Sequence, residues 1–99
     1  MVEVSDVPDE HRYVVTVDGA RAGFMDYKIR GDVFVAIHTE IDPAFGGQGL
    51  GSRLVSSVLD EVRASGRRLS PLCPFVQRFL EGHPEYADLV SHDSGAERS

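Results

Sequence analysis

The stretch "IDPAFGGQGLGSRLV", residues 41–55, decides the fold because two different patterns meet in it. Its four glycines, Gly46, Gly47, Gly49 and Gly51, fall within six residues. Strand-like runs precede it, and from Leu50 onward apolar residues recur at the i, i+4 spacing of an amphipathic helix. The stretch therefore predicts the end of a strand, a glycine-rich loop and the start of a helix.

The residues before the loop predict an antiparallel meander. Three runs rich in β-branched and aromatic residues are separated by turn signals at Asp18-Gly19 and Gly31-Asp32. The predicted strands are 12–17, 20–29 and 33–41.

The third predicted strand, "VFVAIHTEI", carries the polar residues of interest at its end. Strict alternation places Phe34, Ala36, His38 and Glu40 on one face and the valines, Ile37, Thr39 and Ile41 on the other. Because both faces begin with apolar residues, we expect an internal strand covered on both sides.

The residues after the loop predict a helix from Leu50 to a C-terminal cap at Gly66, then a short strand in "RRLSPL". A second helix follows in 73–82 with Cys73 as its N-cap, and "HPEYADLV" predicts a turn or short helix. The order is β-β-β-α-β-α, an α+β fold with a mixed sheet. The crossover makes the third and fourth strands parallel.

Composition favours a single soluble domain, residues 1–91, with 92–99 as a disordered tail. The 99 residues hold no long apolar run and no signal peptide, and the lone Cys73 fits a reducing compartment, so we expect a cytoplasmic protein without a membrane partner. A net charge of −6 argues against nucleic acid. The four histidines show no metal-ligand spacing, so no metal is expected.

Charge is distributed unevenly along the chain. Residues 46–80 hold five arginines against Asp60 and Glu61, a local charge of +3. A basic segment that begins at a glycine loop suits a small anionic ligand. Solvated arginines on an exposed helix face explain the charge alone equally well.

The glycine loop fits neither of two common phosphate-binding motifs. The P-loop lysine is missing between Gly51 and Ser52, and Gly47-x-Gly49-x-Gly51 is one residue short of the dinucleotide fingerprint. What remains is a helix N-terminus with unpaired N–H groups, which binds anions through the backbone. A tight turn needs fewer glycines, and Gly49 and Gly51 each cost about 1 kcal/mol of helix propensity.

The segment "GGQGLGSRLV" resembles the acyl-CoA pyrophosphate loop of the GCN5-related N-acetyltransferases, with Gly49 and Gly51 at the two small positions of the pattern. Gly46 stands where that family has Arg or Gln. "GFMDYKIRGDVFVAIHTEIDPAFGGQGLGSRLV" and "LSPLCPFVQRFLEGHPEYADLV" are similar to its compact, single-domain YjdJ-type subgroup, over roughly residues 10 to 90.

The resemblance implies the minimal mixed sheet of that superfamily and acetyl-CoA-dependent transfer of an acetyl group to a primary amine. Backbone groups around Ile41 would then contact the pantetheine arm. The implied cofactor-binding residues are Ile41, Gly46, Gly47, Gln48, Gly49, Leu50, Gly51, Ser52 and Arg53.

Three residues are candidates for catalysis. Glu40 is the candidate general base, and His38 shares its face two residues away. Cys73, at a helix N-cap where the dipole lowers a thiol pKa, matches a cysteine proposed as catalytic in the compact subgroup. A sheet-capping polar pair and a buried, inert cysteine are the structural alternatives.

Two other functions stay open at this stage. The family's usual tyrosine acid falls at Leu80, and the short chain omits the helices that usually build an acceptor pocket. A CoA-binding module with little or no transferase activity is therefore the alternative. A small interaction domain without a cofactor is the third possibility.

Overall fold

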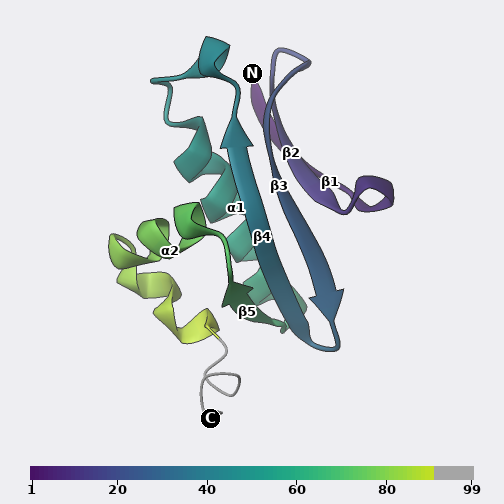
Figure 1. The fold of residues 1–99 in the computed structure, drawn as a ribbon, viewed down its shortest axis with the longest axis vertical. Coiled ribbons are helices and arrows are strands. Elements are labelled where there is room, and N and C mark those ends of the chain that lie inside the picture. Colours follow the sequence, from purple (N-terminus) through teal and green to yellow (C-terminus); the bar gives the residue numbers. More distant parts are fainter. Residues whose placement is uncertain (91–99) are drawn as a thin grey trace.

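The computed structural model describes residues 1–90 and contains a five-stranded mixed sheet with strand order β1-β2-β3-β4-β5 (Figure 1). The strands are β1 Val2–Val7, β2 Arg12–Val17, β3 Ala20–Arg30, β4 Val33–Ile41 and β5 Arg68–Pro71. The helices are α1 Leu50–Ser65 and α2 Pro74–Glu81, with short 3₁₀ helices η1 Pro8–Glu10, η2 Pro43–Phe45 and η3 Pro84–Leu89. The predicted domain boundary at 91 and the tail 92–99 lie outside the described residues.

The predicted mixed sheet is confirmed, with one strand added. β2, β3 and β4 form the antiparallel meander, and β4 pairs with β5 in parallel across the α1 crossover. The prediction missed β1, which pairs antiparallel with β2. Its acidic sequence "VEVSDV" hides a short alternation in which Val2 and Val4 pack against the core.

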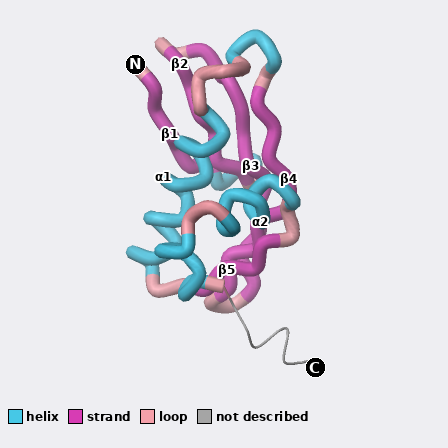
Figure 2. The backbone as a smooth tube through the Cα atoms, turned by 90° about the vertical axis from the view of Figure 1, so that its left-hand side faces the viewer, coloured by secondary structure: helices cyan, strands magenta, loops and turns pink. Residues whose placement is uncertain are grey.

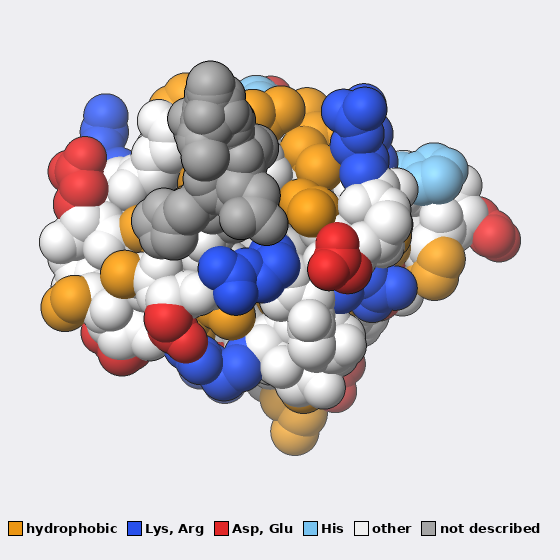
Figure 3. Space-filling model, turned by 90° about the horizontal axis from the view of Figure 1, so that it is seen from below, with side chains coloured by type: hydrophobic (Ala, Val, Ile, Leu, Met, Phe, Trp, Pro, Cys, Tyr) orange, Lys and Arg blue, Asp and Glu red, His pale blue; other side chains and the backbone are white. Residues whose placement is uncertain are grey.

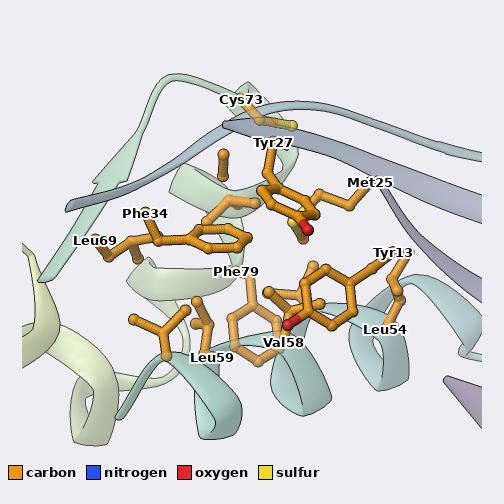
Figure 4. Packing of buried hydrophobic residues seen from close by; sticks show 14 of the residues in the cluster. Tyr13, Met25, Tyr27, Phe34, Leu54, Val58, Leu59, Leu69, Cys73 and Phe79 are labelled. Atoms are coloured by element: carbon orange, nitrogen blue, oxygen red, sulfur yellow. The ribbon is translucent and has the colours of Figure 1, made fainter. Parts of the chain in front are cut away.

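Helix α1 buries one stripe against the sheet and ends as predicted. Leu54, Val58 and Leu59 are fully buried and point toward the aromatic side chains of the strands (Figure 4). Gly66 adopts φ +78°, and its N–H donates to the carbonyl of Arg63, which is the left-handed C-cap that glycine favours. Figure 2 shows α1 and α2 side by side, and both contribute to the same core cluster.

Strand β4 contains a bulge that changes which residues share a face. Asp26 pairs with His38 and Tyr27 with Ala36, so Ile37 is an extra residue without an opposite partner. Phe34, Ala36 and Thr39 are buried, whereas Ile37, His38 and Glu40 are exposed. The predicted common face of Phe34, Ala36, His38 and Glu40 is therefore wrong, because the bulge reverses the alternation after Ala36.

Only one face of the sheet is covered by helices within residues 1–90. Strand β4 is internal, as expected, but no helix lies in front of β2, β3 and β4 in Figure 1. The expectation that both faces of β4 are covered holds for burial only in its first half, because Val35 on the face without helices is 4% exposed whereas His38 and Glu40 are exposed. Among these residues no helix is long and apolar enough to cross a bilayer.

Strand β1 is tied to the core through Tyr27, whose hydroxyl donates to Asp6 at 2.7 Å. Burial, followed by this hydrogen bond, raises the pKa of Tyr27 to about 12. The folded protein therefore keeps a proton that the unfolded chain releases near pH 10, so the free energy of unfolding falls as pH rises from 10 towards 12.

We expect Tyr27→Phe to remove about 1 kcal/mol of the stability loss between pH 8 and pH 11. Urea unfolding of both proteins at the two pH values measures it, and the comparison between pH values cancels the loss of the hydrogen bond itself. An equally steep loss in the variant would contradict the assignment. Tyr13, whose pKa is raised by burial and by Glu61, and Tyr86, whose pKa is raised by its hydrogen bond to Asp60, both contribute to the remaining dependence.

Candidate functional site

Strand β4 has one free edge in its second half. On the β3 side it stays paired as far as Ile41 with Gly23, but on the β5 side pairing stops at Ala36 with Pro71. The N–H groups of Leu72 and Cys73 both donate to the carbonyl of Ala36 at 3.0 Å, and the chain then turns into α2. Residues 37–41 of β4 therefore face α2 without a strand partner in the described part of the chain.

The glycine loop begins just beyond this edge. Asp42 caps η2 by accepting a hydrogen bond from the N–H of Ala44, so a short 3₁₀ turn separates β4 from the glycines. Gly47 and Gly49 have φ of +81° and +72°, with open space where a Cβ would stand. Glycine is required at these two positions by backbone conformation rather than by packing.

Six consecutive backbone N–H groups, from Gly47 to Ser52, have no hydrogen-bond acceptor within residues 1–90. Helix α1 starts here with Gly49 as its N-cap and no side-chain cap. The positive end of the helix dipole thus meets a row of unpaired donors, which is the geometry of an anion-binding loop.

Gly51 has a different explanation. A Cβ at this position would lie 2.3 Å from the Cζ atom of Phe75, so the α2 ring occupies the space. Packing against Phe75 therefore accounts for a glycine at this position without a ligand, and its N–H has no acceptor within residues 1–90. Gly46, with φ −65°, has an ordinary backbone conformation.

A cleft of about 280 Å³ lies next to the loop, between Ser52 at the start of α1 and Phe75, Arg78 and His83 of the α2 region. Neither Arg53 nor Arg78 forms an ion pair with another residue of 1–90. These two guanidinium groups are the positive charges available near the loop.

The remaining arginines of the basic segment lie elsewhere. Arg63 binds Asp88 at 2.9 Å and the carbonyl of Glu85. Arg67 and Arg68 follow the C-terminal end of α1, whose 16 residues span about 24 Å. Figure 3 shows Lys and Arg side chains on this lower end of the molecule. The predicted local charge of +3 is therefore not gathered at the loop, because α1 spreads it along its length.

His38 and Glu40 form the polar pair that alternation predicted, on the uncovered face. His38 Nε2 lies 2.9 Å from Glu40 Oε2, with side chains 51% and 63% exposed. Because an ionised carboxylate only accepts, Nε2–H donates to Oε2, and Nδ1 makes no hydrogen bond within residues 1–90. The pair is open to solvent and able to exchange protons.

Glu40 also borders a groove of about 320 Å³ on the same face, which we call the open-face groove. Its lining residues are Arg12, Val14, Arg21, Ala22, Gly23, Phe24, Glu40, Ile41, Asp42 and Pro43. A Cβ on Gly23 would lie 2.6 Å from the carbonyl oxygen of Glu40, so glycine allows β3 and β4 to approach closely here. The sequence offered no motif for Arg12, Phe24 or Asp42, which three separate segments contribute.

Cys73 is the N-cap of α2, as predicted, but its thiol is buried. Its side chain is 2% exposed, and Sγ donates to Thr39 Oγ1 at 3.3 Å. Leu80 packs against the core, and Tyr86 donates instead to Asp60 at 2.7 Å. A catalytic role for Cys73 stays a prediction, and in this conformation the thiol does not reach solvent.

Metal ligands are not gathered in the described part of the chain. No group of three or more His, Cys, Asp or Glu side chains within residues 1–90 is placed to hold an ion.

Comparison with known protein families shows which family the chain belongs to. The profile of the family described as GCN5-related N-acetyl-transferase matches residues 12–89. None of the curated proteins compared with the sequence matches it. These comparisons do not distinguish subgroups within the family, so membership of the YjdJ-type subgroup stays a prediction.

Solved structures share the fold. A GCN5-like protein from Staphylococcus aureus is 21% identical with a TM-score of 0.69, covering 90% of this chain and 87% of that one. The ribosomal-protein-S18-alanine N-acetyltransferase of Escherichia coli is 26% identical with a TM-score of 0.58, covering 61% and 39%. N-acetylglutamate synthase from Neisseria gonorrhoeae, solved with coenzyme A and N-acetyl-glutamate, is 18% identical with a TM-score of 0.55, covering 71% and 19%. The chain spans less than half of either enzyme.

The contact between Gly51 and Phe75 predicts that Gly51→Ala changes stability in opposite directions in the wild-type protein and in a Phe75→Ala variant. Gly51→Ala alone should lower the melting temperature, because the new methyl group meets the ring. In a Phe75→Ala background the same change should raise stability by up to about 1 kcal/mol, the helix propensity of Ala over Gly. Thermal and urea unfolding of the four proteins measures this, and a destabilisation of equal size in both backgrounds would refute the packing explanation.

Proposed function

This chain belongs to the GCN5-related N-acetyltransferases, and we propose that it transfers the acetyl group of acetyl-CoA to a primary amine. The observation that carries the proposal is the free edge of β4, followed after η2 by six N–H groups that have no acceptor within residues 1–90. An edge and a loop in this order match the parts of one extended ligand that has amide groups at one end and a pyrophosphate at the other.

The loop would hold the pyrophosphate. The N–H groups of residues 47–52, at the positive end of α1, suit its charge, and Arg53 and Arg78 add the available cations. The missing Arg or Gln at Gly46 removes one side-chain contact and no backbone donor. Coenzyme A in the Neisseria N-acetylglutamate synthase structure supports the ligand class.

The free edge of β4 would hold the pantetheine arm. On the side that faces α2, residues 37–41 leave backbone N–H and C=O groups without a strand partner among residues 1–90. An extended chain with two amides can add to such an edge as a short strand does. The arm would thus pass Ile41 and run along the free edge, with the thioester beside β4.

Glu40 is the proposed general base. It takes a proton from the acceptor ammonium, directly or through water, and the free amine nitrogen then bonds to the thioester carbonyl carbon. The carbon–sulfur bond breaks, the amide nitrogen loses its second proton, and the CoA thiolate is protonated. His38 holds the Glu40 carboxylate through Nε2–H and offers Nδ1 as an acceptor for onward proton transfer.

The proton for the leaving thiolate has no evident side-chain source. Leu80 replaces the family's tyrosine, and Tyr86 is committed to Asp60. Solvent would serve, since His38 and Glu40 are exposed. Cys73 would take part only after movement at the start of α2. These features favour the alternative of a CoA-binding module with little turnover.

Binding through the loop is testable with a matched pair of variants. Gly49→Asp and Gly31→Asp each place a carboxylate at a glycine with positive φ and open space, +72° and +62°. We expect only Gly49→Asp to abolish acetyl-CoA binding in isothermal titration, because its charge faces the pyrophosphate. Equal affinities for the two variants, or no binding by the wild type at high micromolar ligand, would overturn the proposal.

Turnover is tested through Glu40. Glu40→Gln keeps the hydrogen-bonding shape but cannot take a proton, so CoA thiol release in an amine panel should fall about 10² to 10⁴-fold. Affinity for acetyl-CoA should be unchanged. Glu81→Gln, an exposed residue of α2, is the control for loss of one charge. Wild-type binding without any thiol release would establish the binding module instead.

A further inference from the structure

We infer that the open-face groove binds the acceptor as an alkylammonium group, a cationic nitrogen on an aliphatic stem, beside Glu40. The inference rests on the proposed function, since it names the class of amine that reaches the base. It is carried by the groove's charges, its apolar wall and its position against β4.

Both arginines of the groove are already neutralised. Arg12 pairs with Asp26 at 2.9 Å, with both groups about one third exposed. Arg21 binds both carboxylate oxygens of Glu10, at 3.0 and 3.4 Å, and holds the pKa of Glu10 below its usual value. Neither guanidinium is left to recognise a carboxylate or phosphate on an acceptor.

The two remaining charges in the groove are negative. Glu40 uses Oε2 for His38, and Asp42 uses Oδ1 for the N–H of Ala44. The other oxygen of each carboxylate has no hydrogen-bond partner within residues 1–90. Two carboxylates beside a groove whose cations are paired favour a cationic ligand.

The wall beside these carboxylates is apolar. Phe24 is paired with Glu40 across β3 and β4, and Val14 and Pro43 complete the surface. The Arg12 guanidinium lies 4.0 Å from the Phe24 ring centroid, so this aromatic surface already accepts a cation. A stem of several methylene groups fits the volume of about 320 Å³.

The groove lies where an acceptor bound in it could receive the acetyl group. Glu40 points to the uncovered face, while the free edge proposed for the pantetheine arm belongs to the same strand. An ammonium held by Glu40 would therefore enter from the open face and meet the thioester at β4. Asp42 and Phe24 are then specificity residues that contact the acceptor.

The test titrates the full chain, without acetyl-CoA, with pentylamine, 1-pentanol and pentanoate at matched ionic strength, following backbone amide shifts by NMR. We expect saturable shifts at Phe24, Glu40 and Asp42 with pentylamine only. Asp42→Asn keeps the hydrogen bond to the N–H of Ala44. It should lower the affinity for pentylamine roughly two- to fivefold, which is the effect of losing one exposed ion pair. Asp9→Asn, an exposed carboxylate outside the groove, should not. Equal shifts with pentanol or pentanoate, or pentylamine shifts confined to other residues, would overturn the inference.

A second titration distinguishes the two possible sources of an alkylammonium group, a lysine side chain in a peptide and a free alkylamine. Nα-acetyl-lysine N-methylamide binding more tightly than pentylamine assigns a lysine side chain in a peptide, and weaker binding assigns a free alkylamine; both support the ammonium groove. Because these titrations omit acetyl-CoA, their failure is distinct from failure of acetyl-CoA binding, which would overturn the proposed function and leave the ammonium site standing.

Discussion

The bulge at Ile37 is the constraint on which the rest of the site depends. One extra residue in β4 reverses the alternation after Ala36, so Thr39 turns into the core while His38 and Glu40 turn out to the uncovered face. It also coincides with the end of pairing to β5, where Leu72 and Cys73 share the carbonyl of Ala36. A regular strand would turn Glu40 to the buried face of Phe34 and Ala36 and remove the exposed polar pair.

Packing between the two helices fixes the loop from behind. Phe75 rests on Gly51, and Leu50 is buried, so the first turn of α1 is anchored while its N–H groups have no acceptor within residues 1–90. The loop itself contributes little packing, since Gly47 and Gly49 have open surroundings. A rigid helix start beneath an uncrowded backbone favours binding through preorganised donors, because few side chains must be ordered when an anion arrives.

Much of this fold follows from sequence patterns, and the errors have identifiable causes. The hairpin turns, the span of α1, its cap at Gly66 and the parallel crossover depend on local signals that tertiary contacts do not override. A bulge leaves no local signal, so alternation misplaced His38 and Glu40 relative to Phe34. Strand β1 was missed because acidic residues dilute its valines. The local charge of +3 was counted along the sequence, but a helix of 16 residues places its two ends far apart, so these arginines do not gather at the loop. Phe24 and Asp42 come from different strands and loops, and only the fold brings them beside Glu40.

Strand β4 presents its two ligand surfaces in different directions, an edge toward α2 and a face toward solvent. Under the proposed function, neither substrate would cover the entrance of the other, and no segment among residues 1–90 must open or close between the two binding events. The two substrates could then bind in either order and form a ternary complex, rather than follow the compulsory sequence that a shared, enclosed pocket imposes.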